Sequence, residues 1–287
     1  MDESIETADG LTLRGREWPL AGAKGTIVLV HGLGEHVGRH AHVAAFLNGC
    51  GWRVVGFDHR GHGTSDGGRG RLRRDDDLLS DLAGVVDLVR RNFPGPLVLL
   101  GHSLGGLVAA RFVAEGVRES GLAAWSRPVD ALVLSSPVLA TGMSLAQKAM
   151  LAVLGPLAPN LAVGNGLKPE WISRDSAVVA AYRADPLVHD RIAPRLARFI
   201  VDGGEFVREA APRWNVPTLL LYAGADRCVE PSGSAAFAAA APRGMVTTRA
   251  FTPLSHEIFN EPERAEVFSV LGDWLDTLPL SIFRSPR

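Results

Sequence analysis

The stretch Leu97-Val98-Leu99-Leu100-Gly101-His102-Ser103-Leu104-Gly105 decides the fold of this chain. Its apolar start is typical of a buried strand, and the residues from Leu104 to Glu115 favour a helix. The Gly-x-Ser-x-Gly pattern between them is typical of a sharp strand-to-helix turn that exposes a serine hydroxyl. Glycines on both sides remove Cβ atoms that would clash in so tight a turn. We therefore expect Ser103 to be a nucleophile at the end of a buried strand.

Working outward from this turn, short apolar segments alternate with helical stretches. This alternation predicts an α/β fold with a mostly parallel central sheet flanked by helices. An antiparallel hairpin is expected first, with Ile5–Ala8 and Leu11–Trp18 around an Asp9-Gly10 turn. The other expected elements are strands at Thr26–Val30, Arg53–Phe57, Leu97–Leu100, Ala131–Leu134, Thr218–Tyr222 and Val246–Phe251, and helices at Leu78–Asn92 and Leu104–Glu115.

One gap breaks this rhythm. Residues 138–214 separate two expected strands and are too many for a single crossover. They include an apolar stretch, Met143–Leu161, and a second helical stretch, Ser173–Tyr182. We interpret 138–214 as a helical cap inserted into a core of 1–137 and 215–287. Such a cap excludes water and shapes a pocket.

A serine hydroxyl needs a histidine to take its proton and an acid to orient that histidine. In folds with this turn, the acid and then the histidine follow the serine in the chain, each at a strand end. Asp226 follows the apolar run Leu219–Tyr222, and His256 follows the last expected strand. Ser103, Asp226 and His256 are therefore the expected catalytic residues.

The oxyanion formed on attack needs preorganised hydrogen-bond donors. One expected donor is the backbone amide of Leu104, directly after the nucleophile. The other is the amide of Leu33, in a loop where Gly32 and Gly34 let the backbone bend inward. A dinucleotide-binding interpretation of this loop fails, because three residues rather than two separate Gly34 from Gly38.

Other chemistry-bearing residues favour simpler interpretations. His31, His36, His40 and His42 lie close in sequence but lack the spacing of a zinc site, so no metal is expected. Cys228 lies two residues after Asp226 and is either an alkylatable thiol near the site or a buried inert one.

Composition excludes several classes of function. The chain has 287 residues, with 30 Lys and Arg against 31 Asp and Glu, so it has no basic footprint for nucleic acid. Its two cysteines cannot form a disulfide framework, and its acidic N-terminus lacks the features of a secretory signal. No apolar run spans a bilayer. We expect a cytoplasmic protein, with peripheral membrane contact left open.

Four blocks of residues resemble a known family. They are His31-Gly32-Leu33-Gly34-Glu35-His36 with Gly38-Arg39, Asp58-His59-Arg60-Gly61-His62-Gly63-Thr64-Ser65, Gly101-His102-Ser103-Leu104-Gly105-Gly106, and Gly224-Ala225-Asp226-Arg227-Cys228-Val229. In this order they are similar to the α/β-hydrolase branch of monoacylglycerol lipases and related lysophospholipases and esterases, and the resemblance covers nearly the whole chain.

The resemblance implies the Ser103, Asp226 and His256 triad, the Leu33 and Leu104 oxyanion hole, and a cap facing an acyl tunnel. It implies substrate contacts for Glu35, Arg39 and Tyr182, no cofactor, and structural roles for Asp58 and Arg60. His40 departs from the pattern, because similar proteins often place a tyrosine after the arginine.

We predict a cofactor-free serine hydrolase that cleaves carboxylic esters, with monoacylglycerols as the favoured substrates. The alternatives are a general carboxylesterase, a lysophospholipase or an amide or peptide hydrolase on the same triad, and a non-catalytic binding protein of the same fold. The apolar stretch Met143–Leu161 would either dock on membranes or micelles or pack against the body. The oligomeric state is unknown from the sequence.

Overall fold

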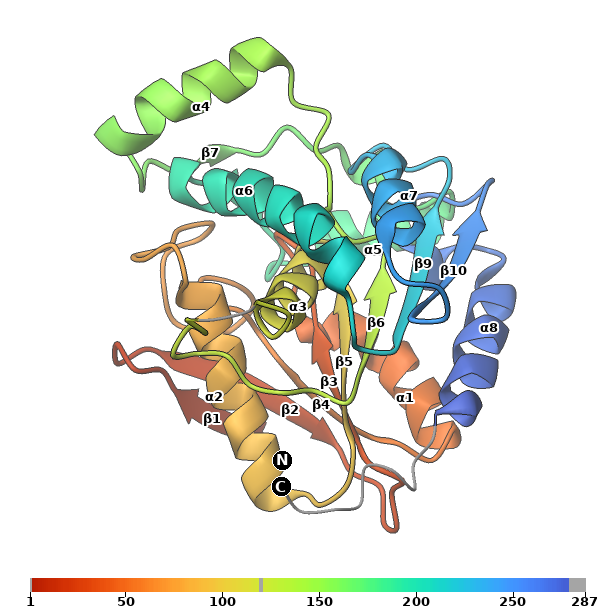
Figure 1. Cartoon of the computed structure of the whole chain (residues 1–287). Coiled ribbons are helices and arrows are strands. Elements are labelled where there is room, and N and C mark those ends of the chain that lie inside the picture. The colour runs from red at the N-terminus through yellow and green to blue at the C-terminus, as the bar shows by residue number, and fades with distance from the viewer. Residues whose placement is uncertain (1, 119–120, 279–287) are drawn as a thin grey trace.

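A computed structural model describes residues 2–118 and 121–278 of the chain. An eight-stranded sheet lies at its centre, with the spatial order β1-β2-β4-β3-β5-β6-β9-β10 (Figure 1). The pairs β1–β2 and β2–β4 are antiparallel, and every other pair is parallel. The strands of this sheet are β1 (Asp2–Glu6), β2 (Thr12–Trp18), β3 (Thr26–Val30), β4 (Arg53–Phe57), β5 (Leu97–His102), β6 (Ala131–Ser135), β9 (Thr218–Ala223) and β10 (Val246–Phe251).

Helices cover both faces of the sheet, as the alternation of segments predicted. The α-helices are α1 (Ala41–Gly49), α2 (Asp77–Asn92), α3 (Leu104–Glu115), α4 (Leu145–Leu157), α5 (Ser176–Ala184), α6 (Pro194–Ala210), α7 (Pro231–Ala240) and α8 (Arg264–Thr277). Short 3-10 helices are η1 (Val37–His40), η2 (Pro169–Trp171), η3 (Ala211–Arg213) and η4 (Ile258–Asn260). Among the described helices, none is both long and apolar enough to cross a bilayer.

The core forms two layers because successive side chains of a strand point to opposite faces of the sheet. On β3, Val28 and Val30 belong to the buried cluster that includes side chains of α2, α3, α6 and α7, whereas Ile27 and Leu29 belong to the cluster that includes those of α1 and α8. All four side chains are fully buried. The continuous apolar character of the central strands therefore reflects helices on both faces.

The first hairpin is present, but β1 ends at Glu6 and β2 begins at Thr12, so the turn is longer than the expected Asp9-Gly10 pair. The Thr7 side chain bonds Asp9 and the Leu11 amide, which organises this wider turn.

The structural roles implied for Asp58 and Arg60 also agree with their contacts. Asp58 accepts hydrogen bonds from the backbone amides of residues 37 and 64, and Arg60 pairs with Asp81.

The insertion between β6 and β9 holds α4, a short ribbon of β7 (Val163–Gly164) and β8 (Arg191–Ile192), η2, α5, α6 and η3. Its helix α6 shares the core with α3, since Leu196, Ile200 and Val207 are buried in the same cluster as Leu107. By contrast, α4 stands beyond α6, away from the sheet (Figure 1). We therefore propose that the cap proper comprises the part of 138–214 that precedes α6.

Candidate active site

Ser103 lies between the end of β5 and the start of α3, in the left-handed region with φ 55° and ψ −118°. This conformation is strained for a residue with a side chain, and strain of this kind is found at functional sites. Its N–H donates to the Ser135 carbonyl at 2.9 Å, which helps to hold the turn. A Cβ on Gly101 would lie 2.4 Å from the Gly105 carbonyl oxygen, and one on Gly105 would lie 2.1 Å from that of Val30. Only glycine therefore permits so close an approach of helix to strands.

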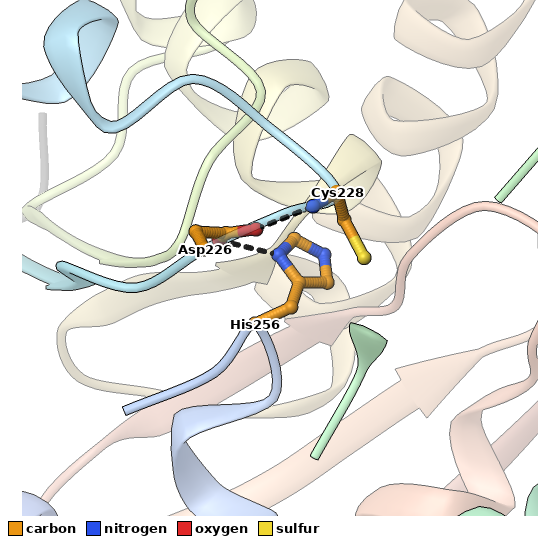
Figure 2. Close-up of side chains that lie close together, drawn as sticks. All are labelled: Asp226, Cys228 and His256. Carbon is orange, nitrogen blue, oxygen red and sulfur yellow. Dashed lines mark hydrogen bonds and ion pairs between the residues drawn. The ribbon is translucent and has the colours of Figure 1, made fainter. Parts of the chain in front are cut away.

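The structure brings the three expected catalytic side chains into one hydrogen-bonded chain. Ser103 Oγ lies 2.8 Å from His256 Nε2, and His256 Nδ1 lies 2.7 Å from Asp226 Oδ2. The second carboxylate oxygen, Oδ1, accepts the backbone N–H groups of Cys228 and Val229 at 2.8 and 3.1 Å. Figure 2 shows the Asp226 carboxylate between the His256 ring and the Cys228 amide. Asp226 thus holds the imidazole with its Nε2 lone pair facing Ser103.

Electrostatics tune His256 for accepting a proton. Burial of the ring lowers its pKa, but the charge and hydrogen bond of Asp226 outweigh burial and raise that pKa above its usual value. The Glu257 and Glu35 charges act in the same direction. An imidazolium formed next to Ser103 is therefore stabilised by the surrounding carboxylates.

Asp226, Cys228 and His256 are also close enough to share a metal ion, with their ligand atoms within 4.8 Å of one another. Each donor already has another role. Both imidazole nitrogens are hydrogen-bonded, and burial followed by the Asp226 charge raises the pKa of the Cys228 thiol. The thiol thus stays protonated at neutral pH, which favours the inert interpretation of Cys228.

The four N-terminal histidines bond four different partners. His31 bonds the Gly32 carbonyl, His36 bonds Asp185, His40 bonds Glu35, and His42 bonds the carbonyl of residue 259. They do not converge on one point.

The candidate oxyanion donors flank the nucleophile. Leu104 is the first residue of α3, where backbone N–H groups lack helical acceptors. Leu33 lies in the loop after β3 and lines the same cavity as Ser103. In the part of the chain that the structure describes, neither N–H donates to another protein group. Gly32 N–H instead donates to Glu35 Oε1 at 2.6 Å, which fixes the residue before Leu33.

Glu35 and Arg39, expected to contact substrate, use their polar atoms within the protein. Glu35 is 3% exposed and accepts hydrogen bonds from Gly32, Arg39 and His40. Burial tends to raise the Glu35 pKa, but the His40 and Arg39 charges hold that pKa well below its usual range. Arg39 donates to Glu35 at 2.7 Å and forms a bidentate pair with Glu257. Glu35 still lines the larger cavity, but Arg39 does not.

Tyr182, on α5, connects the ion pair of Glu35 and Arg39 to the cap. Its ring lies 4.7 Å from the guanidinium of Arg39, and it lines the larger cavity. Burial, followed by the Glu35 charge, raises the Tyr182 pKa, so the phenol stays protonated. The hydroxyl remains available as a donor toward the cavity.

Two cavities meet at Ser103. The larger one, of about 430 Å³, has a mixed lining in which polar side chains such as Glu35, Lys168 and Tyr182 lie beside apolar ones. The smaller one, of about 130 Å³, has a mainly apolar lining that includes Leu104, Val138 and Ile200. Both are also lined by Leu33, Ser103, Asn165, Leu167 and Cys228. Ser103 thus lies where the apolar cavity meets the more polar one.

Sequence reasoning missed Glu257 and Glu261. Glu257 follows His256 directly and holds Arg39, and Glu261 is fully buried beside the same loop. The only available signal was the run of acidic residues after His256, which also suits an exposed helix start.

Comparison with known proteins identifies the family of the chain. Residues 21–263 match the model of a family described as serine aminopeptidase, S33. A monoacylglycerol lipase of Mycolicibacterium smegmatis is 36% identical over 88% of each chain. The human monoglyceride lipase is 34% identical over 80% of this chain and 75% of its own. The crystal structure of a Paleococcus ferrophilus monoacylglycerol lipase superposes with a TM-score of 0.81 at 34% identity, covering 92% of this chain and 98% of that one.

The chain belongs to the α/β-hydrolase family that includes these monoacylglycerol lipases. The resemblance found in the four sequence blocks and the predicted fold class are thereby confirmed. This α/β-hydrolase is a serine hydrolase of the carboxylic ester class.

Proposed function

We propose that this α/β-hydrolase cleaves monoacylglycerols to a fatty acid and glycerol through an acyl-enzyme on Ser103. The observation that carries the proposal is the position of the Ser103–His256–Asp226 chain where an apolar cavity meets a larger and more polar one. A monoacylglycerol has the same division, with an apolar chain and a polar alcohol on either side of its ester carbon. Relatives that are 36% and 34% identical are monoacylglycerol and monoglyceride lipases.

Acylation follows from the distances at the site. Ser103 Oγ attacks the ester carbon while its proton passes to His256 Nε2, 2.8 Å away. The carbonyl oxygen gains negative charge, which the Leu33 and Leu104 amides stabilise. Asp226 keeps the resulting imidazolium in place through Nδ1. When the tetrahedral intermediate collapses, the bond to the glycerol oxygen breaks and His256 gives that oxygen its proton.

Deacylation repeats these steps with water as the attacking group. His256 takes a proton from a water molecule, whose oxygen attacks the acyl carbon. The bond to Ser103 Oγ breaks, and the proton on His256 returns to that oxygen. The cycle restores the enzyme without a metal or cofactor among its steps.

Within this proposal, the acyl chain enters the apolar cavity and the glycerol occupies the polar one. Tyr182 donates its hydroxyl toward the alcohol. Glu35 shapes the wall of the alcohol side and holds the oxyanion loop, and Arg39 acts through both Glu35 and Glu257.

We also propose that the cap lies against lipid aggregates. Several large apolar side chains on and just after α4 face solvent: Leu145, Met150, Val153, Leu157, Leu161 and Val163, all more than half exposed. Exposed apolar groups gathered on one segment are typical of interaction surfaces. Peripheral contact would deliver an insoluble substrate to the adjacent apolar cavity.

The test compares wild type, Ser103→Ala and Ser234→Ala on one set of substrates. Ser234 is a buried serine on α7 and controls for loss of a core hydroxyl. The set contains monoacylglycerols, short p-nitrophenyl esters, a lysophospholipid with the same acyl chain, and an amino-acid anilide. We expect monoacylglycerols to be turned over fastest, with activity lost only in Ser103→Ala.

Faster turnover of another member of the set would overturn monoacylglycerol as the substrate class while retaining the nucleophile. Activity that survives in Ser103→Ala would contradict the mechanism itself.

A further inference from the structure

A buried carboxylate beside the catalytic histidine has no role in the steps above. Glu261, between η4 and α8, has a fully buried side chain that accepts four hydrogen bonds. Its Oε1 accepts from Arg174 N at 2.6 Å and Ser173 Oγ at 2.8 Å, and its Oε2 accepts from Arg174 Nε at 2.7 Å and Ser255 N at 2.9 Å. All of its acceptor capacity is therefore in use.

These four donors come from two segments far apart in the sequence. Ser173 and Arg174 belong to the insertion between β6 and β9, whereas Ser255 immediately precedes His256. On the other side of His256, the Glu257 N–H donates to the Ile172 carbonyl at 2.8 Å. Both neighbours of the catalytic histidine are thus bonded to the same short segment of the insertion or to the carboxylate that holds it.

The same segment also reaches the loop of the catalytic acid. The ring of Trp171, directly before Ile172, lies 5.0 Å from the guanidinium of Arg227, and Arg227 follows Asp226. Residues 171–174, which we name the cap root, therefore contact the loops that carry both Asp226 and His256.

We propose that Glu261 is a positioning residue that fastens the His256 loop to the cap root. By holding residues 255–257 against residues 172–174, it keeps the imidazole within hydrogen-bond distance of Asp226 and Ser103 at the same time. A catalytic group needs placement within about 0.5 Å of its productive position, and it obtains this from surrounding hydrogen bonds. The proposal rests on the catalytic role of His256 given above.

The chemistry of the contacts requires a carboxylate rather than an amide. Glutamine has the same shape but one acceptor oxygen, and its NH₂ group donates hydrogen bonds. In Glu261→Gln, the NH₂ group would face either Ser255 N and Arg174 Nε, which bond Oε2, or Arg174 N, which bonds Oε1. Leaving such a buried donor unpaired is costly, so the loop and the cap root would separate.

Glu115 provides a matched control. Its side chain is also fully buried, and it accepts hydrogen bonds from Arg111, Arg118 and the Ala123 amide. It lies at the end of α3 opposite to Ser103, because Ser103 precedes the first residue of that helix. Glu115→Gln thus removes a carboxylate of similar burial and partners without touching the His256 loop.

The experiment measures kcat, KM and their pH dependence on a soluble short ester for wild type and both Gln variants, with thermal unfolding in parallel. We expect Glu261→Gln to lower kcat by about 10- to 100-fold, with KM changed less than threefold. The acidic limb of its pH profile should also move to lower pH. A displaced His256 ring loses the charge and hydrogen bond of Asp226, which raise the pKa of that ring. Glu115→Gln should lower the unfolding temperature similarly but retain the wild-type kcat and pH profile.

Arg174→Ala keeps the test usable if Glu261→Gln does not fold. The Arg174 side chain is 41% exposed, and its truncation removes one bond to Glu261 while the Arg174 N, Ser173 and Ser255 bonds stay in place. We expect a smaller fall in kcat, of about 3- to 10-fold, with the same shift of the acidic limb.

Wild-type kcat and pH profile in Glu261→Gln, or in Arg174→Ala where the first variant is unfolded, would overturn the positioning role and leave Glu261 purely structural. Failure of the proposed function is distinguishable, since it appears as turnover in Ser103→Ala.

Discussion

Arg39 and Glu257 form a bidentate ion pair, with Nη1 to Oε1 at 2.7 Å and Nη2 to Oε2 at 2.8 Å. Because Glu257 follows His256 and Arg39 also holds Glu35, this pair joins the loop of the base to the loop of Leu33. The two loops that carry the candidate base and the candidate oxyanion donor are thus connected by a charge network.

Removing the Arg39 side chain should lower the free energy of unfolding. In Arg39→Ala, Glu35 and Glu257 remain buried without their cation, which we expect to destabilise the fold by about 3–5 kcal/mol. Denaturant unfolding measures the change. Arg249→Ala is the control, since Arg249 pairs with Glu266 on the surface, with both side chains more than half exposed, and should cost less than about 1 kcal/mol. Equal effects of the two variants would contradict a network role for Arg39.

Activity should fall on the acidic side with a midpoint above pH 6.5. His256 must be neutral to accept the proton of Ser103, and the Asp226 charge and hydrogen bond raise its pKa above 6.5 despite burial. The measurement is kcat/KM from pH 5 to 9 with an uncharged ester, so that only the enzyme titrates. A midpoint below pH 6 would show that burial outweighs Asp226.

Mild acid should destabilise the fold through buried histidines. Burial holds the pKa values of His31, His59, His62 and His102 well below 6.5. Their stabilising contribution is complete above pH 6.5, the unfolded value, and is lost as pH falls toward the folded values. At pH 5.5 each histidine should cost on the order of 1 kcal/mol relative to neutral pH, because the unfolded chain binds the proton.

Chemical unfolding at pH 7.5 and 5.5 measures this loss. His62→Gln should weaken the pH dependence by removing one of the four groups. A free energy of unfolding that is the same at both pH values would contradict the interpretation.

Cys228→Ala should retain kcat within about threefold of wild type. The Cys228 amide, not its sulfur, bonds Asp226, and burial followed by the Asp226 charge raises the thiol pKa so that little thiolate forms. Kinetics on a short ester measure the effect, with Cys50→Ala as the second thiol control. A hundredfold loss confined to Cys228→Ala would assign the sulfur a part in the reaction.

Local patterns sufficed for much of the fold and of the site. The segments Thr26–Val30, Arg53–Phe57 and Val246–Phe251 form strands with the expected bounds. Their apolar runs and flanking turns are encoded within a few residues, so a single window of sequence contains the signal. The turn at Ser103 is equally local, because strand, nucleophile and helix follow one another directly.

The contacts of charged side chains were not predictable in this way. Glu35 and Arg39 were predicted as substrate-binding residues, and the sequence did not predict that their polar atoms bond one another and Glu257. A sequence pattern does not say whether a charged group points into a cavity or toward another buried charge. Glu257, the partner of Arg39, is 218 residues away in the sequence.

The sequence by itself determined the fold class, and it predicted Ser103, Asp226 and His256 as nucleophile, acid and base in that chain order. These depend on hydrophobic periodicity and on turns that close over a few residues. Only the tertiary structure decided that His256 is held from both sides by the cap root and Glu261, and that the Leu33 loop is tied to the His256 loop through Arg39. The physical reason is that hydrogen bonds and ion pairs act over about 3 Å in space. Residues far apart in the chain meet at that distance only after the sheet and its helices have assembled.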